Sequence, residues 1–106
     1  MTSPRRLIVS RRAGADIRSI LRYSFREWGA ERRERYRAQI DRTIDELLAF
    51  PELGPTQQRY SRDMEGVRSR LAGEHVILYR FTNDSLIILR VVHQRMNVSG
   101  GLDTSD

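Results

Sequence analysis

The hydrophobic residues of this 106-residue chain change their spacing once, and the change divides the chain into two parts. Between residues 11 and 50 they recur every three or four positions, which is the period of an amphipathic helix. Between residues 67 and 92 they form short, dense runs separated by two-residue turns, a pattern typical of neighbouring antiparallel strands. The order of these patterns predicts an α+β domain in which the helices precede most of the strands.

The helical part contains two stripes of apolar residues that meet at Gly29. Ser10 is a predicted N-cap for a helix over residues 11–28, and Gly29 is well placed to end that helix. A second helix is expected from Ala30 to about Phe50, where Pro51 stops it. Because the connection around Gly29 is short, the two helices should form an antiparallel hairpin. The stripes comprise Ala13, Ile17, Ile20, Leu21, Phe25 and Trp28, then Tyr36, Ile40, Ile44, Leu47 and Leu48.

The remaining apolar runs predict strands on both sides of the hairpin. The expected strands cover residues 6–9, 67–71, 75–82 and 86–92, with turns at Gly73–Glu74 and Asn83–Asp84 and an irregular connection over residues 51–66. The last three strands should form an antiparallel meander. Two of them are apolar on both faces, so we expect them at the centre of the sheet. The predicted fold is therefore an N-terminal strand, a helical hairpin and a three-stranded meander, with the helices packed on one face of a small mixed sheet.

The length of the chain leaves room for one hydrophobic core. We assign residues 1–96 to a single domain and the polar, glycine-rich residues 97–106 to a flexible tail. No run approaches the roughly 18 apolar residues that span a bilayer, and the N-terminus lacks the apolar core of a secretion signal. The chain has no cysteine, which fits a reducing compartment. We expect a cytoplasmic protein with no membrane partner.

The charge of the chain comes from an unusual set of basic residues. The net charge is +5, and all 19 basic residues are arginine. Guanidinium groups bind carboxylates and phosphates in forked pairs, so an acidic protein or a nucleic acid is an expected partner. Arginine stays protonated, however, and cannot serve as a general base. The two histidines and the scattered carboxylates show no metal-ligand spacing, and neither a metal nor another cofactor is expected.

Several segments of the chain match one known pattern in the right order. The first helix carries Ala13, Asp16, Ile17, Ile20, Tyr23, Trp28 and Gly29, and Pro51 and Gly54 follow the second helix. The strongest match is residues 75–80 (HVILYR), an Asn-Asp turn, and residues 88–97 (ILRVVHQRMN). Together these segments resemble the RelE/ParE superfamily of bacterial toxins, and the ParE branch in particular. The resemblance implies the toxin component of a type II toxin–antitoxin system.

The two branches of this superfamily act differently, and the residues favour one of them. RelE-type toxins cleave messenger RNA on the ribosome, which requires groups that accept and donate protons. The family associates these roles with lysines, arginines and a C-terminal tyrosine. Here lysine is absent, Val76 stands at one arginine position, and no tyrosine follows Arg95. ParE-type toxins inhibit DNA gyrase by binding, so the sequence favours a gyrase inhibitor that is not an enzyme.

Two alternatives stay open. The chain could be a ribosome-dependent mRNA endonuclease, with His93 and Arg95 as its catalytic residues. Glu74 and Tyr79 could complete such a site, although Glu74 is a natural turn residue and Tyr79 fits the core. A non-catalytic His93 would instead hydrogen-bond locally at the end of its strand, and His75 is expected to be structural. The third hypothesis is a non-toxic family member that serves only as a binding module.

The arginines of the strands are the candidate target-binding residues. We select Arg68, Arg70 and Arg95, and alternation along the strand places the first two on one face. Arg80 and Arg90 are flanked by apolar residues, which favours internal ion pairs with a carboxylate such as Asp16.

The resemblance also implies a ParD-like antitoxin as partner. Its disordered, acidic and apolar segment would fold on binding, with Tyr23, Trp28 and Tyr36 of the hairpin as candidate anchors. The helical stripe itself favours a core position for Trp28, where it would close the hairpin. DNA would be contacted indirectly, through the DNA-binding half of the antitoxin.

Overall fold

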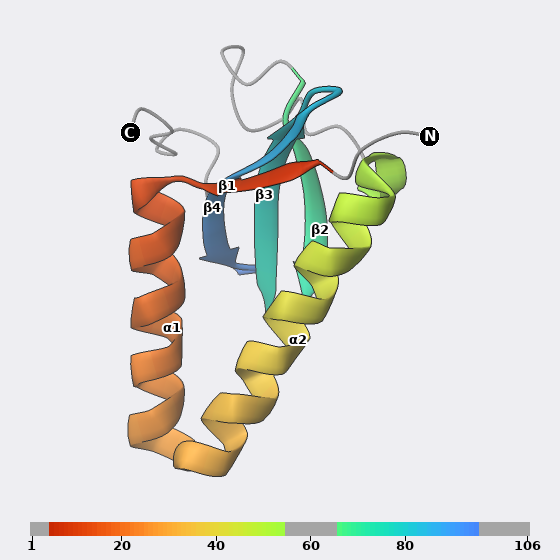
Figure 1. Cartoon of the computed structure of the whole chain (residues 1–106). Coiled ribbons are helices and arrows are strands. Elements are labelled where there is room, and N and C mark those ends of the chain that lie inside the picture. The colour runs from red at the N-terminus through yellow and green to blue at the C-terminus, as the bar shows by residue number, and fades with distance from the viewer. Residues whose placement is uncertain (1–4, 55–65, 96–106) are drawn as a thin grey trace.

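The computed structural model describes residues 5–54 and 66–95 of the chain (Figure 1). Residues 55–65 of the predicted irregular connection between the second helix and the next strand lie outside the described residues, as does the predicted tail over residues 97–106. The α+β order is confirmed, with boundaries within two residues of those predicted. The elements are β1 (Arg6–Val9), α1 (Arg11–Trp28), α2 (Ala30–Ala49), the 3-10 helix η1 (Pro51–Leu53), β2 (Arg68–Ala72), β3 (His75–Phe81) and β4 (Ser85–His93).

The four strands form one mixed sheet in the order β1-β4-β3-β2. Strand β1 runs parallel to β4, whereas β2, β3 and β4 form the predicted antiparallel meander. The central strands are β3 and β4, as their apolar character on both faces predicted. The register shifts where Leu78 pairs with Arg90 and Tyr79 pairs with Ile88, which makes Leu89 the extra residue of a β-bulge.

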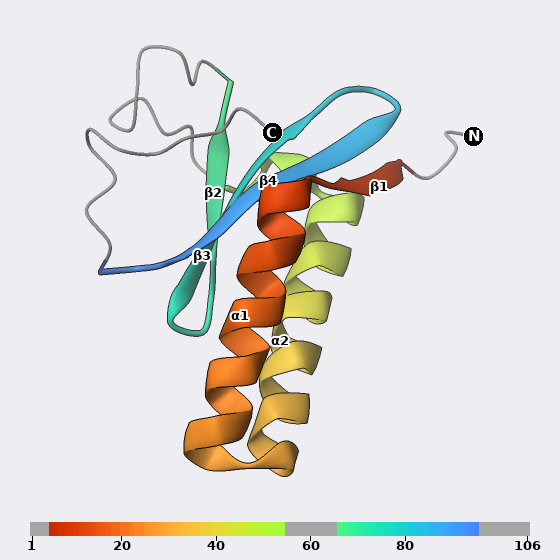
Figure 2. The ribbon, with the colours of Figure 1, turned by 90° about the vertical axis from the view of Figure 1, so that its left-hand side faces the viewer.

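Both helices lie on one side of the sheet and enclose the main core with it (Figure 2). Ser10 caps α1, because its Oγ accepts a hydrogen bond of 3.0 Å from the Ala13 amide. Gly29 joins the helices with a φ of 90°, a backbone conformation that favours glycine. The core residues of the helices are Ala13, Ile40, Ile44 and Leu47, and those of the sheet include Ile77, Tyr79, Leu86, Ile88 and Val91.

The tip of the helical hairpin extends beyond the end of the sheet (Figure 1). In the described part of the chain no strand lies beneath the last turn of α1, and the aromatic side chains of this turn are open to solvent (Figure 1). Trp28 is 57% exposed, so the predicted core position of this residue is wrong. The periodic stripe placed Trp28 on the correct side of the helix but could not show that the sheet ends before it. None of the described helices has the length and apolar character needed to cross a membrane.

Polar contacts also join the helical part of the chain to the sheet. Asp16 of α1 binds Arg90 of β4, with 2.8 Å between Oδ2 and Nε, which confirms the predicted internal ion pair. Arg80, in contrast, is exposed. The buried Tyr79 hydroxyl donates a hydrogen bond to the Pro51 carbonyl and accepts one from the Gly54 amide, which fixes the chain after α2.

Candidate functional site: a groove beside the helical hairpin

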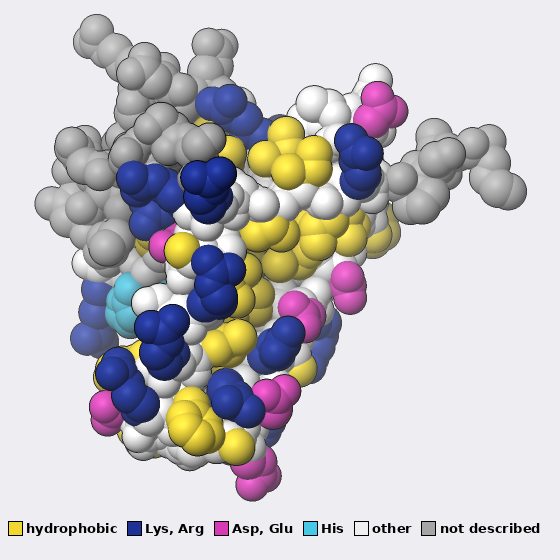
Figure 3. Space-filling model, turned by 60° about the vertical axis from the view of Figure 1, so that its left-hand side comes forward, with side chains coloured by type: hydrophobic (Ala, Val, Ile, Leu, Met, Phe, Trp, Pro, Cys, Tyr) yellow, Lys and Arg dark blue, Asp and Glu magenta, His cyan; other side chains and the backbone are white. Residues whose placement is uncertain are grey.

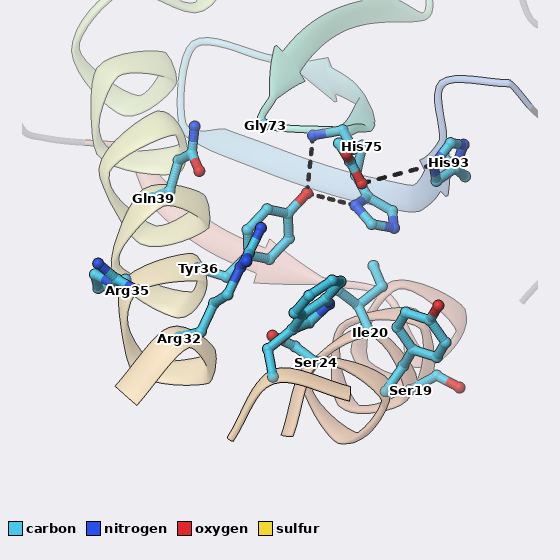
Figure 4. A pocket seen from close by; sticks show the side chains of 13 residues that line it. Ser19, Ile20, Ser24, Arg32, Arg35, Tyr36, Gln39, Gly73, His75 and His93 are labelled. Atoms are coloured by element: carbon cyan, nitrogen blue, oxygen red, sulfur yellow. Dashed lines mark hydrogen bonds and ion pairs between the residues drawn. The ribbon is translucent and has the colours of Figure 1, made fainter. Parts of the chain in front are cut away.

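A groove of about 780 Å³ opens between the two helices and the turn that connects β2 to β3. Helix α1 forms one wall, helix α2 the opposite wall, and the turn together with the ends of β3 and β4 closes it (Figure 4). We call this site the hairpin groove. The lining residues with polar or aromatic side chains include Tyr23, Trp28, Arg32, Arg35, Tyr36, Glu74, His75 and His93.

Tyr36 connects α2 to the turn at the closed end of the groove. Its hydroxyl accepts a hydrogen bond of 3.0 Å from the Glu74 amide. The same oxygen lies 2.5 Å from Nδ1 of His75 and 3.2 Å from the Ala72 carbonyl, and its single proton can serve either acceptor (Figure 4). The ring packs so closely on Gly73 that an added Cβ would lie 2.6 Å from it. Gly73 therefore permits this contact as well as its left-handed φ of 63°.

The two histidines of the chain meet beside Tyr36. His75 and His93 are register partners on β3 and β4, and their rings contact edge to face with 5.3 Å between centroids. Nδ1 of His93 accepts a hydrogen bond from the Arg95 amide, so in the neutral ring the proton lies on Nε2, 3.9 Å from the Glu74 carboxylate. The prediction that His93 bonds locally at the end of its strand is thereby confirmed.

Burial sets the protonation of the groups at the closed end. It lowers the pKa of His75 below the ordinary value of 6.5, and the positive charge of a protonated His93 lowers it further. Burial also raises the pKa of the Tyr36 hydroxyl. Both groups are therefore neutral at pH 7, and they form a hydrogen-bonded pair that supports the floor of the groove.

The open end of the groove is aromatic and basic. Tyr23 is 56% exposed and Trp28 is 57% exposed. The guanidinium of Arg32 lies 4.2 Å from the centroid of the Trp28 ring, a cation–π contact across the hairpin turn. Exposed aromatic side chains beside arginines are typical of surfaces that bind another protein.

The structure brings the three predicted antitoxin anchors together. Tyr23 and Trp28 from α1 and Tyr36 from α2 all line the hairpin groove, although Tyr36 is partly buried and tied to the turn. Sequence reasoning did not select Arg32, Arg35 or Gly73. Sequence spacing gave no signal for the contact between Trp28 and Arg32, because Gly29 places the two residues on different helices.

The predicted target-binding arginines do not form one cluster. The guanidinium of Arg68 donates a hydrogen bond of 2.8 Å to the Gly54 carbonyl, and Arg70 lies 3.6 Å from the Glu46 carboxylate. Both are cross-strand partners of core residues of β3, so they share the helix side of the edge strand β2. Arg95 is exposed and follows β4, on the opposite side of β3. Target binding by these residues stays a prediction.

The candidate nuclease residues are only partly assembled. His93 and Glu74 lie together in the hairpin groove with His75, but Tyr79 is buried at the break after α2. Arg95 contacts His93 through its backbone amide. Among the described residues, no group of three or more histidines and carboxylates could hold a metal ion.

The comparisons with known proteins agree on one family. Residues 7–98 match the model of the ParE toxin of the type II toxin–antitoxin system parDE. Toxin ParE1 of Caulobacter vibrioides is 35% identical over 94 residues, which cover 89% of this chain and 94% of that protein. Toxin ParE1 of Mycobacterium tuberculosis H37Rv is 32% identical over 98 residues, covering 92% of this chain and 97% of that protein.

A solved structure supports the same fold. The chain is similar to a structure described as the chromosomal ParDE TA system from P. aeruginosa, with a TM-score of 0.69 and 21% identity. The match covers 84% of this chain and 95% of that chain. The chain belongs to the ParE family of toxins of type II toxin–antitoxin systems.

Proposed function

We propose that this toxin is neutralised by a ParD-like antitoxin whose C-terminal segment occupies the hairpin groove. The observation that carries the proposal is the exposure of Tyr23 and Trp28 on a groove that also presents Arg32 and Arg35. The solved relative from P. aeruginosa is described as a ParDE system, which supports an antitoxin as the partner.

The chemistry of the groove defines the segment that would fit it. Apolar side chains spaced at one face of a helix would pack on Tyr23 and Trp28, and carboxylates of the same segment would pair with Arg32 and Arg35. Such a segment is acidic and apolar, and it would order on binding. DNA would then be reached through the DNA-binding half of the antitoxin.

Substitution of two exposed aromatic residues, one inside the groove and one outside it, tests the antitoxin site. Trp28→Ala should weaken binding of the cognate antitoxin by about 2 kcal/mol, roughly thirtyfold in Kd, because a tryptophan that is exposed in the free protein and covered by a partner is a typical hot spot. Phe50→Ala is the matched control, since Phe50 is 66% exposed and lies outside the groove. Calorimetry with both variants provides the comparison. Equal affinities for Trp28→Ala and Phe50→Ala would place the antitoxin elsewhere.

We propose further that the free toxin acts in the cytoplasm on DNA gyrase, by binding and without a chemical step. The chain has no lysine, and its arginines cannot take up a proton from a ribose hydroxyl. Tyr36 and His75 hydrogen-bond to each other within the fold, which suits a structural role. A binding surface is all that inhibition of this kind requires.

The test uses gyrase from the same organism. Purified toxin should inhibit supercoiling and increase cleaved DNA, and the antitoxin should relieve both effects. Ribosome-dependent RNA cleavage is the second candidate, because His75, His93 and Glu74 lie together in the groove. Cleavage of messenger RNA on ribosomes, lost in His93→Ala, would favour that activity. Folded protein with neither effect would favour a non-toxic binding module.

A further inference from the structure

Helix α1 carries a row of arginines on the side opposite the core. Arg11, Arg18, Arg22 and Arg26 are all exposed, and we call these four residues the arginine ridge. At 3.6 residues per turn they fall within an arc of about 80° and extend over about 22 Å of the helix. Figure 3 shows arginine side chains gathered over the face of the molecule that this helix forms.

Among the described residues, no carboxylate neutralises the positive charge of the ridge. No acidic residue occurs three or four positions from any of its arginines in the sequence. In the part of the chain that the structure describes, none of the four takes part in an ion pair. Asp16, on another face of α1, is already bound to Arg90. The ridge is therefore available to an anionic partner, and it is separate from the hairpin groove, which it does not line.

The residues between the arginines indicate which polyanion fits. Gly14, Ala15 and Ser19 lie beside them, and these small side chains allow a flat surface to approach the helix. A single-stranded nucleic acid would need exposed aromatic rings for its bases. Tyr23 and Trp28 line the groove instead, and the half-exposed ring of Phe25 is already contacted by the guanidinium of Arg33, 4.9 Å from its centroid.

We infer that the arginine ridge binds the phosphate backbone of duplex DNA, independently of base sequence. The ridge is as long as about six phosphates of one strand, since their rise is about 3.4 Å per nucleotide. Four arginines that neutralise phosphates release counterions, and affinity then falls steeply with salt. This contact would be made by the toxin itself, in addition to any contact that the antitoxin makes.

The salt dependence of binding tests this inference without gyrase or antitoxin. Anisotropy of a labelled 20-base-pair duplex should give a slope of log K against log salt near −3.6 for four phosphate contacts, with Kd about 1–100 μM near physiological salt. The double variant Arg18→Ala/Arg22→Ala should reduce the slope to about −1.8. The variant Arg37→Ala/Arg42→Ala removes the same charge from exposed positions of α2 and should leave the slope near that of the unchanged toxin.

Several results would overturn the inference. Equal losses in the two double variants would mean that net charge alone is responsible. Failure of the toxin to bind the duplex in low salt would also overturn the inference. Tighter binding of a single-stranded RNA of equal length would assign the ridge to another nucleic acid. If polyglutamate binds and the duplex does not, the ridge instead serves an acidic protein.

Discussion

At the scale of single residues, Asp16 joins the helical hairpin to the sheet through three hydrogen bonds. Its carboxylate accepts two from Arg90 and one from the Val91 amide. Both side chains of the pair are less than one-fifth exposed. The sequence alone suggested the pair, because an arginine between apolar residues needs an internal carboxylate. It could not show the third bond, because the Val91 amide is a backbone group whose position residue type does not reveal.

Removal of this carboxylate should destabilise the fold. Asp16→Ala would remove the carboxylate that binds both a largely buried guanidinium and the Val91 amide, at a cost of about 2–4 kcal/mol in the free energy of unfolding. Glu46→Ala is the control, because the Glu46–Arg70 pair is more exposed and is expected to contribute less than about 1 kcal/mol. Urea denaturation measures both variants. Similar losses in the two would show that the Asp16 pair has no special role.

Stability should also depend on pH through His75. Its pKa is lowered in the fold by burial, so below pH 6.5 the unfolded chain binds more protons than the folded chain. The free energy of unfolding should therefore fall as the pH decreases from 6.5 toward the lowered pKa, and remain unaffected by this group above 6.5. The charged or titratable groups around the ring are His93, Glu74, Asp16 and Tyr36.

The variant His75→Asn isolates this contribution. Asparagine can still accept a hydrogen bond from Tyr36 but does not titrate. Urea denaturation of the variant between pH 5 and 8 should show a weaker decrease in acid than the unchanged protein. An identical decrease would mean that other groups cause the pH dependence.

At the scale of elements, the local pattern of residue types was sufficient to predict where the helices and strands begin and end. The N-cap at Ser10, the breaks at Gly29 and Pro51, and the two turns of the meander all came from residue type and spacing. The groove could not be obtained in this way, because it depends on how far the hairpin projects beyond the sheet. Trp28 shows the difference: its helical face was predictable, but its 57% exposure was not.

The turn between β2 and β3 should be intolerant of a side chain at its glycine. Gly73→Ala would force an alanine into the left-handed backbone conformation of this position and press its methyl group into the Tyr36 ring. The two effects should cost about 2–4 kcal/mol in the free energy of unfolding. Gly66→Ala is a matched control, since Gly66 has a φ of 81° but nothing within 4 Å, and about 1–2 kcal/mol is expected. Thermal or urea denaturation compares them. A loss at Gly73 no larger than at Gly66 would show that the Tyr36 contact is unimportant.

At the scale of the whole molecule, the toxin presents two distinct surfaces. The hairpin groove is aromatic and basic and suits an acidic, apolar segment. The arginine ridge faces away from the core and suits a phosphate backbone. The net charge of +5 indicated an anionic partner, but charge alone could not distinguish these surfaces. Their separation required the orientation of α1 relative to the sheet.

We propose that this ParE-family toxin inhibits gyrase by binding and not by catalysis. Titration of a fixed amount of gyrase with toxin, followed by supercoiling activity, tests it most directly. We expect inhibition to increase with toxin up to a fixed molar ratio, to be independent of further incubation, and to be reversed by the antitoxin. Substoichiometric toxin that inactivates gyrase progressively, or toxin that leaves gyrase active at any ratio, would contradict the claim.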